Sequence, residues 1–150
     1  MYDSTSDTKK HIKAIQNVYG EKIKPYIDKR FENHDRSKLQ DPELTMYNTY
    51  IPQLQKVKYG SDEYNAIRDK MYNEGLKHHF EVNRHHPEHF SGNLNQMNLI
   101  DLLEMLCDWY AASQRSDTSF EEGLMINFER YNVSPILVDI IMNTYKDIIK

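Results

Sequence analysis

The chain has 150 residues, of which 39% are apolar and 28% are charged, and it carries a formal net charge of -4. This length suits one domain and excludes a large two-domain enzyme, and no apolar run approaches the roughly 18 residues that a membrane span needs. The mild acidity excludes duplex DNA and an anionic membrane surface as partners, because both require clustered Lys and Arg. We therefore expect one soluble domain over residues 1–150, with residues 1–7 as a flexible tail.

The cysteine content and the N-terminus indicate the compartment. The single cysteine, Cys107, rules out an intramolecular disulfide and a Cys-rich zinc module. Residues 1–10 are polar and lack the apolar segment of a secretory signal. We expect a cytoplasmic protein in which Cys107 is an inert core thiol, because no signature of a nucleophile surrounds it.

The apolar residues recur at helical spacing, and five glycines and five prolines leave little turn chemistry for a sheet. The pattern predicts an all-α fold, a compact bundle of about six or seven helices. A first helix is expected to end at Gly20, and its apolar stripe consists of Ile12, Ile15, Val18 and Tyr19. A second helix tolerates Pro25 in its first turn and stops near Asn33.

The next two helices carry the histidine-rich part of the chain. Asp41-Pro42-Glu43 caps and opens a third helix, which Pro52 is expected to kink or end. Gly60-Ser61-Asp62-Glu63 opens a fourth helix. This helix is expected to run through His79 and to end near His86, because Pro87 disfavours helical geometry at the residue before it.

The C-terminal third predicts three more helices. The most apolar one runs from roughly Gln96 to Ser113, and another runs from Ser119 to about Tyr131. The last begins at the pair Ser134-Pro135. The side chains of this last helix that we expect to face inward are Ile136, Leu137, Ile140 and Ile141.

The most apolar helix also carries three carboxylates, Asp101, Glu104 and Asp108, at positions i, i+3 and i+7. This spacing places them on one helix face, within about 60° of each other. One interpretation is the wet face of an amphipathic helix. The other is a buried acidic stripe, which requires cations, hydrogen-bond donors or a metal opposite it, because unpaired buried carboxylates are costly.

Histidines form a second stripe. All seven lie between His11 and His89, and the fourth helix places His79, Asn83 and His86 on one face at i, i+4 and i+7. The other three on this segment, His78, His85 and His89, are expected to point elsewhere or to lie past the end of the helix. Together with the adjacent pair His34-Asp35, the two stripes form the mixed nitrogen and oxygen environment that suits Mn, Fe, Co or Zn, where bound water becomes a nucleophile.

A lone early His, a His-Asp pair and a late Asp on an all-helical chain resemble the HD-domain metal phosphohydrolases. The resemblance implies one or two divalent ions, drawn from Mn, Fe, Co, Mg or Zn. The ligands it implies are His11, His34, Asp35 and Asp108. Asp101 competes with Asp108 for the last position, and the additional histidines His79 and His86 resemble those of two-metal members. Because His11 lies near a terminus, we favour a centre that does not depend on it.

Three segments together resemble a family of small uncharacterised proteins from bacteria and their phages. They are the His-Asp-x-Ser-Lys segment at 34–38, the run 79–90, and Asp-Leu-x-Glu-Met-Leu-x-Asp-Trp at 101–109. The likeness spans roughly residues 11–112, and the combined motifs are more specific than a bare His-Asp pair. No reaction is assigned to that family, so the resemblance implies none. The expected function rests on the His and carboxylate residues that could bind a metal and on analogy with the HD-domain fold.

The leading hypothesis is a metal-dependent phosphohydrolase acting on a small phosphate ester, with a nucleotide as the expected substrate. Lys38 and Arg84 would neutralise charge on the phosphoryl group. The alternatives are simple ion pairs, of Lys38 with Asp41 and of Arg84 with Glu81 or Glu88. Glu104 would carry a proton or orient a histidine, or would form a buried salt bridge instead.

Two other functions are compatible with the sequence. Helical His and carboxylate sites also hold di-iron centres that activate dioxygen, and some HD-like proteins are oxygenases. A small helical interaction or inhibitor module would use the same polar residues as a structural network. The apolar segment 136–149 could serve the core or a contact in a homodimer.

Overall fold

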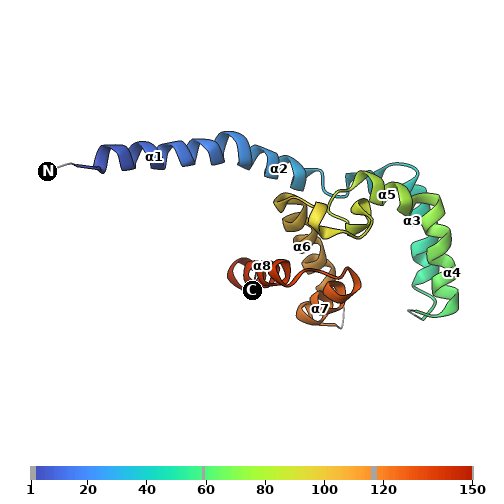
Figure 1. Cartoon of the computed structure of the whole chain (residues 1–150). Helices are drawn as coiled ribbons and strands as arrows, with labels where there is room; N and C mark the ends of the chain where they lie inside the picture. The colour runs from blue at the N-terminus through green and yellow to red at the C-terminus, as the bar shows by residue number, and fades with distance from the viewer. Residues whose placement is uncertain (1–2, 59, 116–117, 150) are drawn as a thin grey trace. The chain divides into compact units, whose positions relative to one another are not determined.

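The computed structural model describes residues 3–58, 60–115 and 118–149. Across these ranges the chain is all-α and contains no strand, as the sequence predicts (Figure 1). It divides into two compact units, Met1–His34 and Asp35–Lys150. The expectation of one domain over residues 1–150 stays a prediction. Within the described ranges, no helix has both the length and the apolar character needed to cross a membrane.

The described residues of the unit Met1–His34 form one continuous helix from Thr5 to Glu32. α1 (Thr5–Val18) passes through a π-helical turn, Tyr19–Ile23, into α2 (Lys24–Glu32). The prediction that Gly20 ends the first helix is therefore wrong. A glycine ends a helix where the backbone turns out of the helix, and here the backbone continues through Gly20. The wider π-helical turn leads into the first turn of α2, which accommodates Pro25 without a break. α1 also begins inside the segment 1–7 that we expected to be a tail, whereas α2 ends at Glu32 with Asn33 as its C-cap, as predicted.

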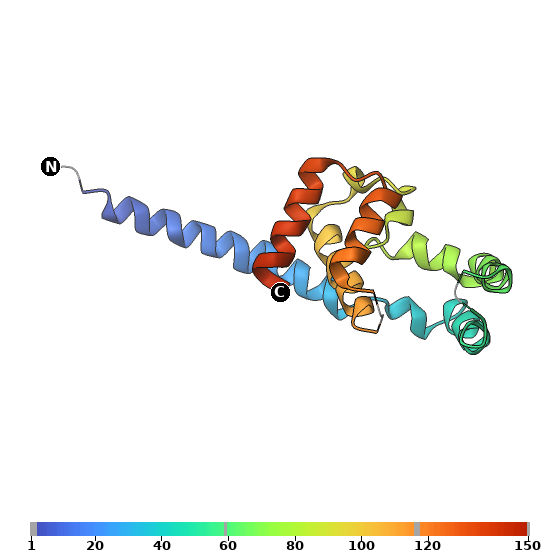
Figure 2. The ribbon, with the colours of Figure 1, turned by 90° about the horizontal axis from the view of Figure 1, so that it is seen from below.

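The unit Asp35–Lys150 begins with a helical hairpin. α3 (Glu43–Leu54) and α4 (Asp62–Met71) lie side by side (Figures 1 and 2). A π-helical turn, Tyr72–Leu76, continues α4 into α5 (Lys77–Val82). Pro52 lies inside α3, two residues before its end. The buried apolar residues of this part are Met46, Tyr50, Met71 and Leu76.

Gly75 explains how closely α3 approaches the π-helical turn. A Cβ atom at Gly75 would lie 2.9 Å from the Cβ atom of Met46, which is closer than side chains tolerate. The absence of a side chain therefore permits the close packing of α3 against the segment that leads into α5. This contact fixes the position of α5, which carries His78 and His79.

The second part of this unit is a three-helix arrangement of α6 (Leu99–Ser113), α7 (Phe120–Arg130) and α8 (Pro135–Thr144), extended by the π-helical turn Tyr145–Ile149. Asn98, Ser119 and Ser134 cap the three N-termini by accepting backbone N–H groups. Their shared core consists of Leu94, Met97, Met105, Leu106, Phe120, Leu124, Phe128, Ile141 and Tyr145. When segments joined by π-helical turns are counted as one, the described ranges hold six helices, within the predicted number.

The orientation of α8 differs from the prediction. Ile141 is buried and Leu137 packs against the core, but Ile136 is 75% exposed and Ile140 is 48% exposed. At about 100° per residue, each exposed side chain lies a quarter-turn from the inward-facing residue that follows it. The continuous apolar run did not show which of these neighbouring positions contacts the core.

Candidate metal centre

Asp35 is held by an unusual backbone turn. Its φ of 53° and ψ of 17° lie in the left-handed region, which Asp tolerates better than most residues. A short 3₁₀ helix, Arg36–Leu39, follows and brings Ser37 and Lys38 to the same side chains. The Lys38 ammonium donates to a carboxylate oxygen of Asp35. The turn thus supplies an acid, a hydroxyl and a cation within four residues of sequence.

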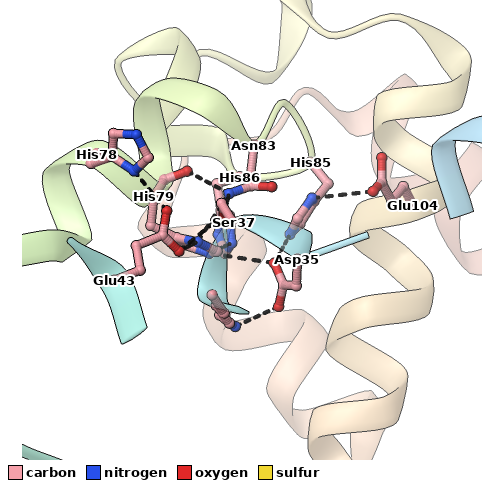
Figure 3. A network of polar contacts seen from close by, with 10 residues as sticks. Asp35, Ser37, Glu43, His78, His79, Asn83, His85, His86 and Glu104 are labelled. Carbon is pink, nitrogen blue, oxygen red and sulfur yellow. Dashed lines mark hydrogen bonds and ion pairs between the residues drawn. The ribbon is translucent and has the colours of Figure 1, made fainter. Parts of the chain in front are cut away.

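Three imidazoles converge on Asp35 (Figure 3). Nε2 of His79 lies 3.5 Å from Oδ1 of Asp35, and Nε2 of His85 lies 3.4 Å from the same oxygen. Nε2 of His86 lies 2.8 Å from Nε2 of His79. One ligand atom from each of the four residues lies within 4.8 Å of all the others. We call these four residues the ligand cluster.

The spacing of the ligand cluster fits a single transition-metal ion. Zinc lies about 2.0–2.2 Å from His nitrogens and carboxylate oxygens, so neighbouring ligand atoms are about 2.8–3.1 Å apart in octahedral geometry and about 3.3–3.6 Å apart in tetrahedral geometry. The separations of 2.8, 3.4 and 3.5 Å lie close to these ranges. Three imidazoles and one carboxylate form a donor set that suits Zn, Fe, Co or Mn.

Glu43, at the start of α3, fixes the orientation of His79. Its side chain is fully buried, and its Oε2 atom lies 2.8 Å from Nδ1 of His79. Its other oxygen, Oε1, lies 2.8 Å from Nδ1 of His78, and Ser37 donates to Oε2 at 3.0 Å. A buried carboxylate with three partners is well satisfied. It is the second-layer acid that metal-binding histidines commonly have.

This network determines which nitrogen of His79 carries the proton. The amide nitrogen of Asn83 lies 2.8 Å from the Ser37 hydroxyl, 2.9 Å from the His79 carbonyl and 3.0 Å from Nδ1 of His79. The shorter contact of Nδ1, at 2.8 Å, is to a carboxylate oxygen of Glu43, which accepts, so we assign the proton to Nδ1. The Nε2 atom of His79 keeps a lone pair directed at the ligand cluster, as a metal ligand requires.

A second buried glutamate lies behind His85. Glu104 of α6 is 3% exposed, and its Oε1 atom lies 3.3 Å from Nδ1 of His85 (Figure 3). A carboxylate oxygen of Asp108, one turn further along α6, lies within 4.8 Å of a carboxylate oxygen of Asp35. Two of the three acids on the α6 stripe therefore face the cluster. Glu104 has the histidine-orienting position that the sequence predicted as one of its roles.

The protonation of the cluster favours metal binding. Burial, with the neighbouring His85 and His79, lowers the pKa of His86 to about 3, and burial also lowers the pKa of His79. Burial by itself would raise the pKa of Asp35, but hydrogen bonds from His85 and Lys38 outweigh it and the pKa lies below its usual range. Neutral imidazoles and an ionised carboxylate are the forms that bind cations.

A pocket of about 240 Å³ opens beside the cluster. His79 and His86 line it together with three cations, Lys38, Arg68 and Arg130. Its aromatic wall is formed by Tyr47, Phe80, Trp109 and Tyr131. Glu88 also lines the pocket and pairs with Arg130, so three cations face one acid. A metal ion held by the imidazoles would therefore face a space with net positive charge, which suits an anionic ligand.

The sequence-predicted ligands divide into three groups. Asp35, His79 and His86 meet in the cluster, and Asp108 lies near Asp35. His34 is the last residue of the unit Met1–His34, and His11 lies in α1 of the same unit. Their roles as ligands stay predictions.

Asp101 is placed differently from the other acids of the stripe. Its carboxylate accepts the Arg84 guanidinium through Nε at 3.2 Å and Nη2 at 2.8 Å, and it accepts the backbone N–H of Asn98 at 3.0 Å. Asp101 therefore closes the capping box of α6 and pairs with Arg84. Arg84 contacts neither Glu81 nor Glu88 in this arrangement, and its guanidinium also lies over the Phe90 ring. These contacts occupy both residues away from the ligand cluster.

Sequence reasoning missed His85 and Glu43. His85 lies past the end of its helix, one of the two placements expected for it, because α5 ends at Val82 and Asn83 is extended, with φ of -107° and ψ of 103°. The prediction missed that His85 reaches the cluster from there. Helical spacing therefore does not apply beyond Asn83, although His79 and His86 still meet. Glu43 was assigned only to the first turn of a helix. The sequence feature that could have pointed to His85 and Glu43 is the abundance of histidine in this part of the chain.

In this all-α protein, two buried imidazoles, a partly buried third imidazole and a carboxylate converge, and buried glutamates lie behind two of the imidazoles. These features place it in the class of helical proteins with a candidate metal centre. The chain belongs to a family of unknown function, DUF5662, whose model matches residues 1–147. This membership agrees with the resemblance to an uncharacterised family and covers all three of its segments. No curated protein and no solved structure matches the chain.

Proposed function

We propose that this protein is a metal-dependent phosphohydrolase that cleaves a small phosphate ester with water as the nucleophile. The observation that supports it best is the ligand cluster, in which Asp35, His79, His85 and His86 offer ligand atoms within 4.8 Å of one another. The cluster borders a cationic pocket, which suits an anionic substrate. The likeness to HD-domain phosphohydrolases is part of this proposal and makes a nucleotide the expected substrate.

The donor set makes Mn, Fe, Co or Zn a better occupant than Mg, because Mg prefers a shell of oxygen ligands. A divalent ion at this position supplies Lewis acidity toward a phosphoryl oxygen and lowers the pKa of water. His34, which precedes Asp35, would add a ligand if the HD-domain likeness holds. The residues that hold the imidazoles in orientation are Glu43 and Glu104.

The cations of the pocket would bind the phosphate. Lys38, Arg68 and Arg130 all line it, so they can neutralise negative charge on non-bridging phosphoryl oxygens. Lys38 also holds Asp35, which ties the anion-binding group to the ligand cluster. Arg84 pairs with Asp101 and is not among the residues that line the pocket, so we assign the phosphate contacts to Lys38, Arg68 and Arg130. Of these, Arg130 also pairs with Glu88.

Metal content and phosphate release test the proposal together. Protein purified without added metal should contain about one transition-metal ion per chain by elemental analysis. A panel of nucleotides and simple phosphate esters should release phosphate in the presence of Mn, Fe, Co or Zn, and a chelator should stop the release. Asp35→Asn and His79→Gln should lose both the metal and the activity.

His89→Gln is the matched control, because the Nδ1 atom of His89 contacts the Phe80 carbonyl instead of the ligand cluster. This variant should keep the metal. Absence of bound metal in the wild type, with no phosphate release under any metal, would contradict the proposal. Bound iron with an optical iron-oxo band in the wild type would favour the oxygenase. An Asp35→Asn variant that is less stable than the wild type but keeps the same metal content would favour the interaction module.

A further inference from the structure

A second pocket lies next to the cationic one. It has a volume of about 370 Å³ and lies between the end of α6 and the start of α7. Its apolar lining comes from Trp109, Ala112, Phe120 and Leu124, with Ser113, Thr118, Ser119 and Asn127 adding polar groups. Trp109 and Asn127 line both pockets. The two pockets therefore adjoin at these two residues.

Gly123 keeps this second pocket open. It lies within α7, and an added Cβ atom would have no neighbour within 4 Å. A glycine inside a helix costs stability relative to alanine. Neither a positive φ nor a close approach explains Gly123, in contrast to Gly75, whose added Cβ would meet Met46 at 2.9 Å. What Gly123 provides is room in the pocket that it lines.

We propose that this pocket binds the organic group of the substrate, and that this group is an aromatic or heteroaromatic ring. The inference rests on the phosphohydrolase proposed above, whose cationic pocket would hold the phosphate. The partly buried indole of Trp109 offers an apolar surface for such a ring, and the buried side chains of Phe120 and Leu124 lie beneath the pocket. The amide of Asn127 and the hydroxyls at the rim can bind the polar edge of the ring. Gly123 acts as a specificity determinant, since any side chain there would shorten the space.

Trp109 is the only tryptophan in the chain, so its fluorescence reports on this pocket. The experiment titrates the protein, in the presence of a chelator, with adenosine monophosphate and separately with ribose phosphate, which lacks the ring. Excitation at wavelengths that tyrosine does not absorb isolates Trp109. We expect saturable quenching by adenosine monophosphate, with an affinity about tenfold or more above that of ribose phosphate, which is the contribution of one buried ring.

Two variants fill the pocket from different helices. Gly123→Leu and Ala112→Leu should abolish the affinity difference between the two probes while leaving metal content unchanged. Gly123→Ala adds only one methyl group and should raise the Tm by about 2 °C, because it removes a helix-interior glycine. Gly20→Leu, in the unit Met1–His34, is the matched glycine exchange outside the pocket and should leave the difference intact.

Equal affinities for the two probes in the wild type, or an affinity difference that survives both filling variants, would overturn the inference. That result leaves the phosphohydrolase proposal standing if metal-dependent phosphate release persists with esters of non-aromatic groups. Absence of metal and of phosphate release, by contrast, removes the proposed function whatever the fluorescence shows.

Discussion

At the scale of single residues, the geometry of the ligand cluster depends on side chains that do not belong to it. Glu43 is the clearest case, because its two carboxylate oxygens contact His78, His79 and Ser37. Its charge and position decide that His79 presents an unprotonated Nε2 atom to the cluster. Removing the charge should therefore weaken metal binding even though the ligands themselves are unchanged.

Glu43→Gln should lower the metal affinity by about 10–100-fold, the usual effect of losing a second-layer partner of a metal-binding histidine. Competition with a chromophoric chelator measures it. Glu81→Gln is the matched control, since Glu81 of α5 is exposed and contacts Lys77 instead of the network. An unchanged affinity in Glu43→Gln would show that Glu43 does not orient His79.

Tyr131 gives a pH-dependent prediction for the wall of the cationic pocket. Burial, then the charge of Glu88, raises the pKa of the Tyr131 phenol, whose hydroxyl donates to Glu88 at 2.8 Å. The unfolded chain ionises Tyr at about pH 10. The stability that the neutral phenol contributes is therefore complete below that pH and decreases as the pH rises above it.

Glu88→Gln should lower the pKa of Tyr131, because glutamine still accepts the hydrogen bond but carries no charge. Ultraviolet absorbance titration detects phenolate formation, and subtraction of a Tyr131→Phe titration isolates this residue from the other tyrosines. If the titration of Tyr131 is the same in Glu88→Gln and in the wild type, burial alone sets the pKa.

At the scale of elements, α6 shows how one helical stripe divides into separate roles. Asp101, Glu104 and Asp108 share a face, as their spacing predicted. Asp101 closes the capping box and pairs with Arg84, Glu104 lies behind His85, and Asp108 lies near Asp35. The difference arises because each turn of α6 meets a different segment of the chain.

Asp101→Ala should lower the free energy of unfolding by about 2–3 kcal/mol, through the lost cap and the lost hydrogen bonds to a charged partner. The metal content should not change. Urea denaturation and elemental analysis of the same preparation measure the two effects. Asn98→Ala, which removes the other half of the capping box, should cost about 1 kcal/mol. Loss of the metal in a folded Asp101→Ala protein would return Asp101 to the set of ligands.

The helix that carries the histidines shows where periodicity stops being informative. The pattern predicted a helix through His79 to about His86, but α5 ends at Val82. The chain then folds back through Asn83, whose side chain is tied to Ser37 and to the His79 carbonyl. His85 and His86 both reach the cluster for that reason, although a helix would separate neighbouring side chains by about 100°.

At the scale of the whole unit Asp35–Lys150, the cluster joins segments that are distant in sequence. Its ligands come from the turn at Asp35 and from the segment His79–His86, and the buried glutamates behind them come from α3 and α6. A metal ion bound there holds these segments together. Metal binding and folding of this unit should therefore be coupled.

Adding metal to the chelated protein at about 100 times its dissociation constant should stabilise the fold by about 2.7 kcal/mol, which corresponds to a rise in Tm of roughly 5–10 °C. Thermal unfolding over a series of metal concentrations measures this effect. The Asp35→Asn variant should show no such dependence. A wild-type Tm that does not respond to metal would mean that the cluster binds no ion in the folded protein.

The sequence by itself determined the fold class, most of the helix boundaries and the chemistry of the candidate centre. These properties depend on local patterns, such as helical spacing and capping residues, and on the types of side chain present. Only the tertiary structure decided that His85 meets Asp35 and that Glu43 lies behind His79. It also decided that Asp101 pairs with Arg84 and which face of α8 is buried. Those outcomes depend on contacts between segments far apart in the chain, and no local pattern encodes which segments meet.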